Sequence, residues 1–368
     1  MASSKEPKLT TDELTLHLIA SGLVEFVTKY VEKGKPLKLP YPKSLQLGLD
    51  KLIVACLRQG TTPPQGIPDL LRWCRDKPIA EWTLKLSEYA FCAGDRLLDE
   101  YTPTITTICE DWACASPNVE YELTENKFFL DILSTCKNAD AQETYVAFRR
   151  LLISHPVLTE LELQQHNIDP NLVLLAEQMQ VAYQEAPIAY CINGLFHCCS
   201  SCGSLLLGGT LICENNHCRV TGKYKSGREI KETEGVRCLK RGIKRFIAVP
   251  GLAELRLEKK LQKLGVQVEL WPNFDSYDLR IVFPDGEAWA VDVKYWANPF
   301  LLARNVKPIP NDPPWTQAYF VFPNERKKQR SDYVRAFCNH CHLIEKNGNT
   351  KAMFEQYFLK QVKSRLKV

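Results

Sequence analysis

The feature that most constrains the fold is a pair of strand-like runs joined by turn residues. The first run is residues 278–283, Asp-Leu-Arg-Ile-Val-Phe, and the second ends in residues 291–294, Val-Asp-Val-Lys. The segment 284–287, Pro-Asp-Gly-Glu, supplies turn chemistry between them. Alternate residues of a strand share a face, so Asp292 and Lys294 project together while the two valines pack the other way. The sequence therefore predicts a β-hairpin that carries two carboxylates and a lysine.

Context singles out this pair, because the pattern Asp/Glu-x-Lys occurs six times in the chain and only Asp292 lies in a strand-like alternation. A two-residue turn at residues 285–286 would pair Asp278 with Val293 and place it on the face opposite Asp292. The prediction therefore requires a bulge or a loop of odd length at Gly286, or a place for Asp278 just before the strand. The alternative is an ordinary hairpin with a surface salt bridge.

A helix is predicted in front of the hairpin, over residues 252–264, with an apolar stripe that Gly265 ends. Glu254 and Glu258 both fall on or beside this stripe. Glu254 lies nearer its centre, although either could be a third acid. Strands are predicted over residues 266–270 and 317–322. Five prolines between Asn298 and Trp315 predict a loop there.

This order of elements resembles the PD-(D/E)XK nuclease superfamily. Archaeal-type Holliday-junction resolvases have a similar layout, and the spacing of Glu254, Gly265 and Asp278 matches theirs. The resemblance implies that Asp278 and Asp292, with the carbonyl of Val293, hold Mg²⁺ or Mn²⁺ through hard oxygen ligands. Lys294 would stand beside the attacking water and the phosphate, and Glu254 would orient the metal or its waters.

Further segments resemble the restriction-endonuclease-related proteins encoded beside bacterial PIWI-RE Argonaute-like proteins. They are residues 40–50, 70–74, 275–280 and 292–299. That family implies DNA cleavage within a defence complex that contains a PIWI-RE protein and a helicase.

A second motif lies upstream, at Cys199-Ser-Ser-Cys202-Gly203, which has the form of a zinc knuckle. Cys213 and Cys218 follow after an apolar run that is broken by two glycines, as in the hairpin of a zinc ribbon. Four thiolates would close a structural Zn²⁺ site. Cys198 could replace Cys199, and His217 could replace Cys218. The lone pair Cys338 and Cys341 is more often structural than metal-binding.

The 368 residues suffice for two or three domains, and their 45% hydrophobic and 24% charged content is that of a globular protein. The predicted fold class is α/β: an all-helical N-terminal region (1–185), a zinc ribbon (186–236) and a restriction-endonuclease-like α/β core with a mixed sheet and basic C-terminal helices (237–368). The chain has no apolar run of membrane-spanning length, and Met1–Pro7 lacks a signal-peptide core. A cytoplasmic protein with reduced cysteines is therefore predicted.

The formal net charge of +4 is unevenly distributed. From Arg326 onward there are eleven basic residues against three acidic ones, interleaved with aromatic residues. A second basic cluster, residues 237–245, precedes the helix with Glu254. Such stretches suit a phosphate-facing surface, although a solvated helical face has the same composition.

The combined prediction is a metal-dependent DNA endonuclease, a phosphodiester hydrolase that acts in antiviral, restriction-like bacterial defence. The preference for DNA over RNA rests on the family resemblance. Two alternatives remain open: a catalytically inactive zinc-ribbon subunit that docks DNA, and a stand-alone branched-DNA resolvase, usually a homodimer.

Overall fold

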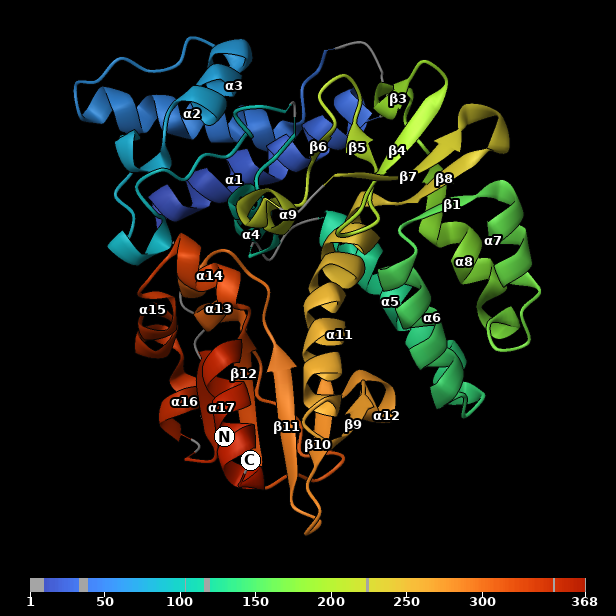
Figure 1. Ribbon diagram of the computed structural model, residues 1–368. Helices are drawn as coiled ribbons and strands as arrows, with labels where there is room; N and C mark the ends of the chain where they lie inside the picture. The colour runs from blue at the N-terminus through green and yellow to red at the C-terminus, as the bar shows by residue number, and fades with distance from the viewer. Residues whose placement is uncertain are drawn as a thin grey trace. The chain divides into compact units, whose positions relative to one another are not determined.

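The computed structural model describes residues 10–32, 39–102, 104–115, 120–222, 225–346 and 348–367, so the prediction made for Met1–Pro7 lies outside the described residues. The chain forms two compact units (Figure 1). Unit 1 comprises Met1–Glu122, Trp296–Val306 and Arg335–Cys341, and unit 2 comprises Leu123–Tyr295, Lys307–Val334 and His342–Val368. The division at residues 185 and 236 stays a prediction. Within the described ranges, no helix is long and apolar enough to cross a membrane.

Unit 1 is built from helices. They are α1 (Thr11–Phe26), α2 (Lys43–Arg58), α3 (Ile67–Asp76), α4 (Thr107–Cys114), α13 (Pro299–Asn305) and most of α15 (Tyr333–His340). A capping box between Thr10 and Glu13 begins α1. Gly22 lets α1 approach α2 closely, because a Cβ atom there would lie 2.4 Å from the backbone nitrogen of Leu45.

The proline-rich segment that predicted a loop begins instead with helix α13, so that prediction is wrong over residues 299–305. Asn298 caps the helix, since its side-chain oxygen accepts hydrogen bonds from the amides of Phe300 (3.0 Å) and Leu301 (3.2 Å). Pro299 stands in the first turn, where a missing N–H costs nothing.

Unit 2 begins with helices and a small sheet. The helices are most of α5 (Glu120–Asn138), α6 (Gln142–Ser154), α7 (Glu160–Asn167) and α8 (Ala176–Ala182). The strands β1 (Val157–Thr159) and β2 (Tyr183–Glu185) pair with the two edges of β8 (Val236–Leu239). The all-helical prediction for residues 1–185 is therefore wrong at these two strands, which are too short for a period-2 pattern to show.

The segment predicted as a zinc ribbon contains two further small sheets. One consists of β3 (Cys191–Ile192), β4 (Leu195–Cys199) and β7 (Ser226–Lys231). The other is the hairpin of β5 (Leu206–Leu207) and β6 (Ile212–Cys213), followed by α9 (Asn216–Thr221). Gly209 has a φ of +82° in the hairpin turn, a value that few residues other than glycine adopt.

The largest sheet has the order β13-β12-β11-β10-β9 (orange to red in Figure 1). Its strands are β9 (Gln267–Leu270), β10 (Leu279–Val282), β11 (Ala288–Val293), β12 (Gln317–Phe322) and β13 (Thr350–Phe354). The first three pair antiparallel and the last three parallel, so the predicted mixed sheet is confirmed. Helices α11 (Val249–Gln262) and α17 (Glu355–Leu366) contribute Leu257, Leu261, Phe358 and Val362 to its apolar core.

The hairpin between β10 and β11 has a loop of odd length. Leu279 faces Val291 and Val282 faces Ala288, and the amide of Phe283 donates to the carbonyl of Glu287. Three residues, 284–286, thus close the turn, and Gly286 takes a φ of +84°. Asp278 lies just before β10, and the same register sets it opposite Asp292.

Candidate active site and metal centre

Asp278, Asp292 and Lys294 lie together on one face of the hairpin. The carboxylate of Asp278 accepts a 2.6 Å hydrogen bond from the amide of Val293, and the ammonium of Lys294 lies 2.7 Å from Asp292 Oδ1. Their side chains are 13%, 15% and 26% exposed, so each keeps some contact with solvent. The loop at Gly286 has the odd length that the sequence prediction required. As predicted, Asp278, Asp292 and Lys294 are therefore grouped on one face.

Electrostatics in this cluster oppose the loss of the Asp278 proton. Burial raises the pKa of Asp278 well above its usual value, and the nearby Glu254 and Asp292 raise it further. Burial lowers the pKa of Lys294, but the attraction of Asp292 and Asp278 outweighs this effect and the pKa ends above its ordinary value. A cation placed between the carboxylates would relieve their repulsion.

Glu254, on α11, lies in the same cluster but is enclosed. Its side chain is 3% exposed and accepts hydrogen bonds from Arg149 Nη2 (3.0 and 3.2 Å) and from the indole nitrogen of Trp271 (2.5 Å). Glu258, one turn further along, pairs instead with Arg150 at 2.5 Å. Of the two glutamates that the sequence left open, Glu254 is the one beside Asp278.

Two charged residues of this cluster were not predicted. Arg149, on α6, forms ion pairs with Glu254 and Asp275, and its Nη2 lies 3.8 Å from Asp278 Oδ1. Its guanidinium lies 4.5 Å above the ring centroid of Trp271. The sequence did contain a signal for Arg149. This residue follows Tyr145 by one helical turn and so lies on the buried stripe of its helix, and a charged residue in such a position is a candidate site residue, as Glu254 was.

Asp275 is aimed at Arg149 by an unusual backbone. Trp271, Asn273, Phe274 and Asp275 all have φ between +46° and +71°. Such a run costs free energy in residues other than glycine and needs support from its surroundings. Gln142, on α6, provides part of it: its side chain donates to the carbonyl of Trp271 (2.8 Å) and accepts from the amide of Phe274 (2.6 Å).

When every group is ionised, the cluster has four negative and two positive charges, a net charge of −2. The acids are Glu254, Asp275, Asp278 and Asp292, and the bases are Arg149 and Lys294. Oxygen ligands and a charge of −2 fit one Mg²⁺ or Mn²⁺, which commonly binds one or two carboxylates and keeps several waters. Asp278 and Asp292 are the carboxylates that could hold it, because Glu254 and Asp275 form close ion pairs with Arg149.

The thiols of Cys199, Cys202, Cys213 and Cys218 form the second candidate metal centre. All four are buried, and their sulfur atoms lie within 4.8 Å of one another. Zn–S bonds of about 2.3 Å give tetrahedral S–S edges of about 3.8 Å, and Cys202 and Cys213 are already 3.6 Å apart. The cluster could therefore bind zinc with no position left open.

The alternative ligands left open by the sequence are occupied elsewhere. Cys198 packs in a separate apolar cluster with Phe196 and Leu205, and burial raises the pKa of its thiol to about 11. His217 lies 2.7 Å from Glu325 and 3.1 Å from Arg256. Both residues contact other parts of unit 2 rather than completing the thiol cluster. Cys338 and Cys341 are not part of any converging group of ligands among the described residues.

The basic stretches are divided between internal ion pairs and solvent. Arg326 is buried and donates to the carbonyl of Tyr295 (2.7 Å), and Lys244 pairs with Glu214 (2.9 Å). Among the residues from 326 onward whose burial the structure describes, the exposed cations are Lys327, Lys328, Arg335, Lys351, Lys360, Lys363 and Lys367. The exposed cations are thus fewer than the sequence count suggested.

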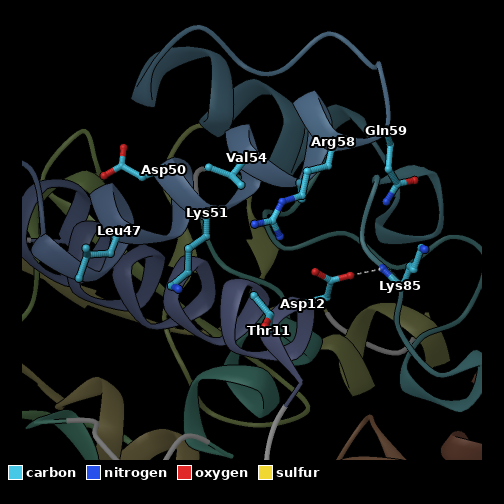
Figure 2. A pocket seen from close by; sticks show the side chains of 10 residues that line it. Thr11, Asp12, Leu47, Asp50, Lys51, Val54, Arg58, Gln59 and Lys85 are labelled. Atoms are coloured by element: carbon cyan, nitrogen blue, oxygen red, sulfur yellow. Dashed lines mark hydrogen bonds between the residues drawn. The ribbon is translucent and has the colours of Figure 1, made fainter.

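Unit 1 has a surface hollow of about 570 Å³ between α1, α2 and the segment at Lys85 (Figure 2). Its lining mixes Lys51 and Arg58 with Asp12 and Asp50. Asp12 accepts a 2.7 Å hydrogen bond from the amide of Lys85. With Lys85, the lining has three cations against two acids, and among the described residues it contains no converging group of metal ligands. The hollow is therefore not a second candidate catalytic centre.

Comparison with known proteins gives two family matches. Residues 251–368 match a family described as the REase associating with pPIWI_RE, and residues 15–159 match the family of the pPIWI_RE three-gene island domain Y. No curated protein and no solved structure matches the chain. The two family matches confirm the resemblance to restriction-endonuclease-related proteins of PIWI-RE islands.

Proposed function

On the premise that this chain is a restriction-endonuclease-related protein of a PIWI-RE island, we propose that it is a divalent-metal-dependent endonuclease that cleaves DNA in bacterial defence. The observation that carries the proposal is the three-residue loop at Gly286, which brings Asp278 opposite Asp292 and beside Lys294. A chance Asp-x-Lys pair on a strand would not need a second acid at this position.

The residues divide the chemistry of phosphodiester hydrolysis among them. Asp278 and Asp292 would hold the cation, with the carbonyl of Val293 as a further ligand. The bound cation supplies Lewis acidity and lowers the pKa of a bound water. Lys294, kept protonated by its acidic neighbours, would place a positive charge beside the phosphate. Glu254 and Arg149 keep the acids in place.

The island context supports a role among partner proteins. The match of residues 15–159 to domain Y of the three-gene islands favours association with a PIWI-RE protein and a helicase. The four-cysteine cluster would contribute a structural zinc ribbon, and the exposed C-terminal lysines would contact DNA phosphates.

The test is cleavage of linear, supercoiled, four-way and single-stranded DNA and of RNA, with Mg²⁺, Mn²⁺ or EDTA, by the purified chain alone and with its island partners. We expect DNA cleavage that EDTA, Asp292→Ala and Lys294→Ala abolish. Lys231→Ala is the matched control, because Glu229-x-Lys231 has the same spacing on strand β7 without an opposing acid.

Three outcomes would contradict parts of the proposal. Cleavage that survives Asp292→Ala would exclude the hairpin as the centre. Absence of cleavage in every combination, with DNA binding intact, would favour an inactive docking subunit. A strong preference of the chain alone for four-way DNA would favour a stand-alone resolvase.

A further inference from the structure

We infer that Arg149 is a built-in second cation of the acidic centre, so that this centre binds one divalent cation rather than two. The inference rests on the proposed function and specifies the metal content of the same site. Arg149 is a positioning residue in this account, since it acts through Glu254 and Asp275.

The first argument is that hydrogen bonds already engage both carboxylate oxygens of Glu254. Both of its oxygens accept hydrogen bonds from Arg149, and one also accepts from Trp271. A carboxylate that is 3% exposed and bound by three donor contacts cannot approach a second ion without breaking them. Within the described part of the chain, the carboxylates do not converge into a group of three metal ligands, as the four cysteines do.

The second argument is that Arg149 is held rigidly. Its side chain is 9% exposed, stacks on Trp271, and contacts the hydroxyl of Tyr145 (3.3 Å) and the carboxylate of Asp275. A planar guanidinium held between two acids and an aromatic ring has little freedom to leave. The strained segment 271–275 and its clamp Gln142 fix the partners in the same arrangement.

The third argument is charge. With Arg149 and Lys294 present, one divalent cation brings the net charge from −2 to zero, whereas two would leave it at +2 in a largely enclosed site. Removal of the guanidinium would change the net charge of the cluster to −3. Glu254 and Asp275 would lose their ion-pair partner and become available as ligands. The centre would then have both the ligands and the charge for a second ion.

The experiment counts Mn²⁺ ions by calorimetric titration and by electron paramagnetic resonance on the full chain, with the cysteine site loaded with zinc. We expect one ion in the wild type, two in Arg149→Met, and one in the control Arg150→Met. Arg150 is adjacent, is more exposed, and pairs with Glu258 outside the cluster. Near-ultraviolet circular dichroism checks that each variant is folded.

Glu254→Gln provides a test should Arg149→Met fail to fold. Because Glu254 is not a ligand in this arrangement, the variant is expected to bind one Mn²⁺ with less than tenfold loss of affinity. Two ions in the wild type would overturn the inference and leave the nuclease proposal standing. One ion in a folded Arg149→Met, or none in Glu254→Gln, would also overturn it. No Mn²⁺ in the wild type, with or without DNA, would contradict both.

Discussion

Replacement of Asp278 by Asn should make the metal-free protein more stable, although it should remove the proposed metal binding and DNA cleavage. Asp278 lies beside Asp292 and near Glu254, and burial together with these charges raises its pKa well above the usual value. An acid with a raised pKa binds its proton more tightly in the folded chain. Stability is therefore lost as pH rises from the ordinary Asp pKa towards the folded value. Asn carries no charge and can still accept the hydrogen bond from Val293.

The size of the gain follows from linkage. Each unit by which the folded pKa exceeds the unfolded one corresponds to about 1.4 kcal/mol at high pH. We expect Asp278→Asn to raise the free energy of unfolding by roughly 1–2 kcal/mol in EDTA. In a folding unit as large as unit 2, each 1 kcal/mol of added stability raises the Tm by about 2–4 °C. A divalent cation at a concentration one hundred times its Kd should stabilise only the wild type, by about 2.7 kcal/mol. In the presence of the cation, the wild type should therefore be more stable than Asp278→Asn.

The assay is thermal and urea unfolding between pH 5 and 9, in EDTA and in Mg²⁺. The difference between variant and wild type in EDTA should grow with pH. Asp285→Asn is the control, because this exposed acid pairs with Arg365, whose hydrogen bond lowers the pKa of Asp285, so its replacement should not stabilise the chain. The reasoning is refuted if Asp278→Asn is less stable than the wild type in EDTA, or if Mg²⁺ stabilises both equally.

Three further outcomes are expected. Lys294→Met should lower kcat for DNA cleavage by about 10²-fold or more with little change in DNA affinity, measured by single-turnover kinetics and fluorescence anisotropy; an unchanged rate would remove Lys294 from the reaction. Cys202→Ser should abolish binding of one Zn²⁺ and cost several kcal/mol of unfolding free energy, followed by metal analysis and melting, and full zinc retention would contradict the four-thiolate site. Gly22→Ala should destabilise unit 1 by about 1–3 kcal/mol in urea unfolding, because the new methyl group would clash with the backbone of Leu45. In the control Gly94→Ala, the methyl group would point into open space, so the free energy of unfolding should change by no more than about 0.5 kcal/mol.

The hairpin could be predicted in unusual detail because its constraints are local. Strand alternation fixes which residues of one strand share a face. Whether Asp278 lies on the same face as Asp292 then depends only on the number of residues in the loop between the two strands. The glycine at 286 indicated where the irregularity would lie. The four cysteines could be found for a similar reason, since knuckle spacing is set by the geometry of one turn.

The rest of the centre could not be predicted because it depends on tertiary contacts. Arg149 and Glu254 are 105 residues apart, and nothing in either helix specifies the partner. Asp275 enters the cluster through left-handed backbone at Trp271 and Phe274, which local propensity disfavours. The strands β1 and β2 form only because β8 lies between them, so their three-residue sequences carry no signal of their own.

The ion pair between Arg149 and Glu254 also limits how such proteins can evolve. Arg149 belongs to the segment similar to domain Y, whereas Glu254 belongs to the segment similar to the restriction endonuclease. If either segment were exchanged for that of a distant relative, a buried charge would lose its partner, at a cost of about 3–5 kcal/mol. The two segments should therefore be inherited together, and among relatives a change at residue 149 should accompany a change at residue 254.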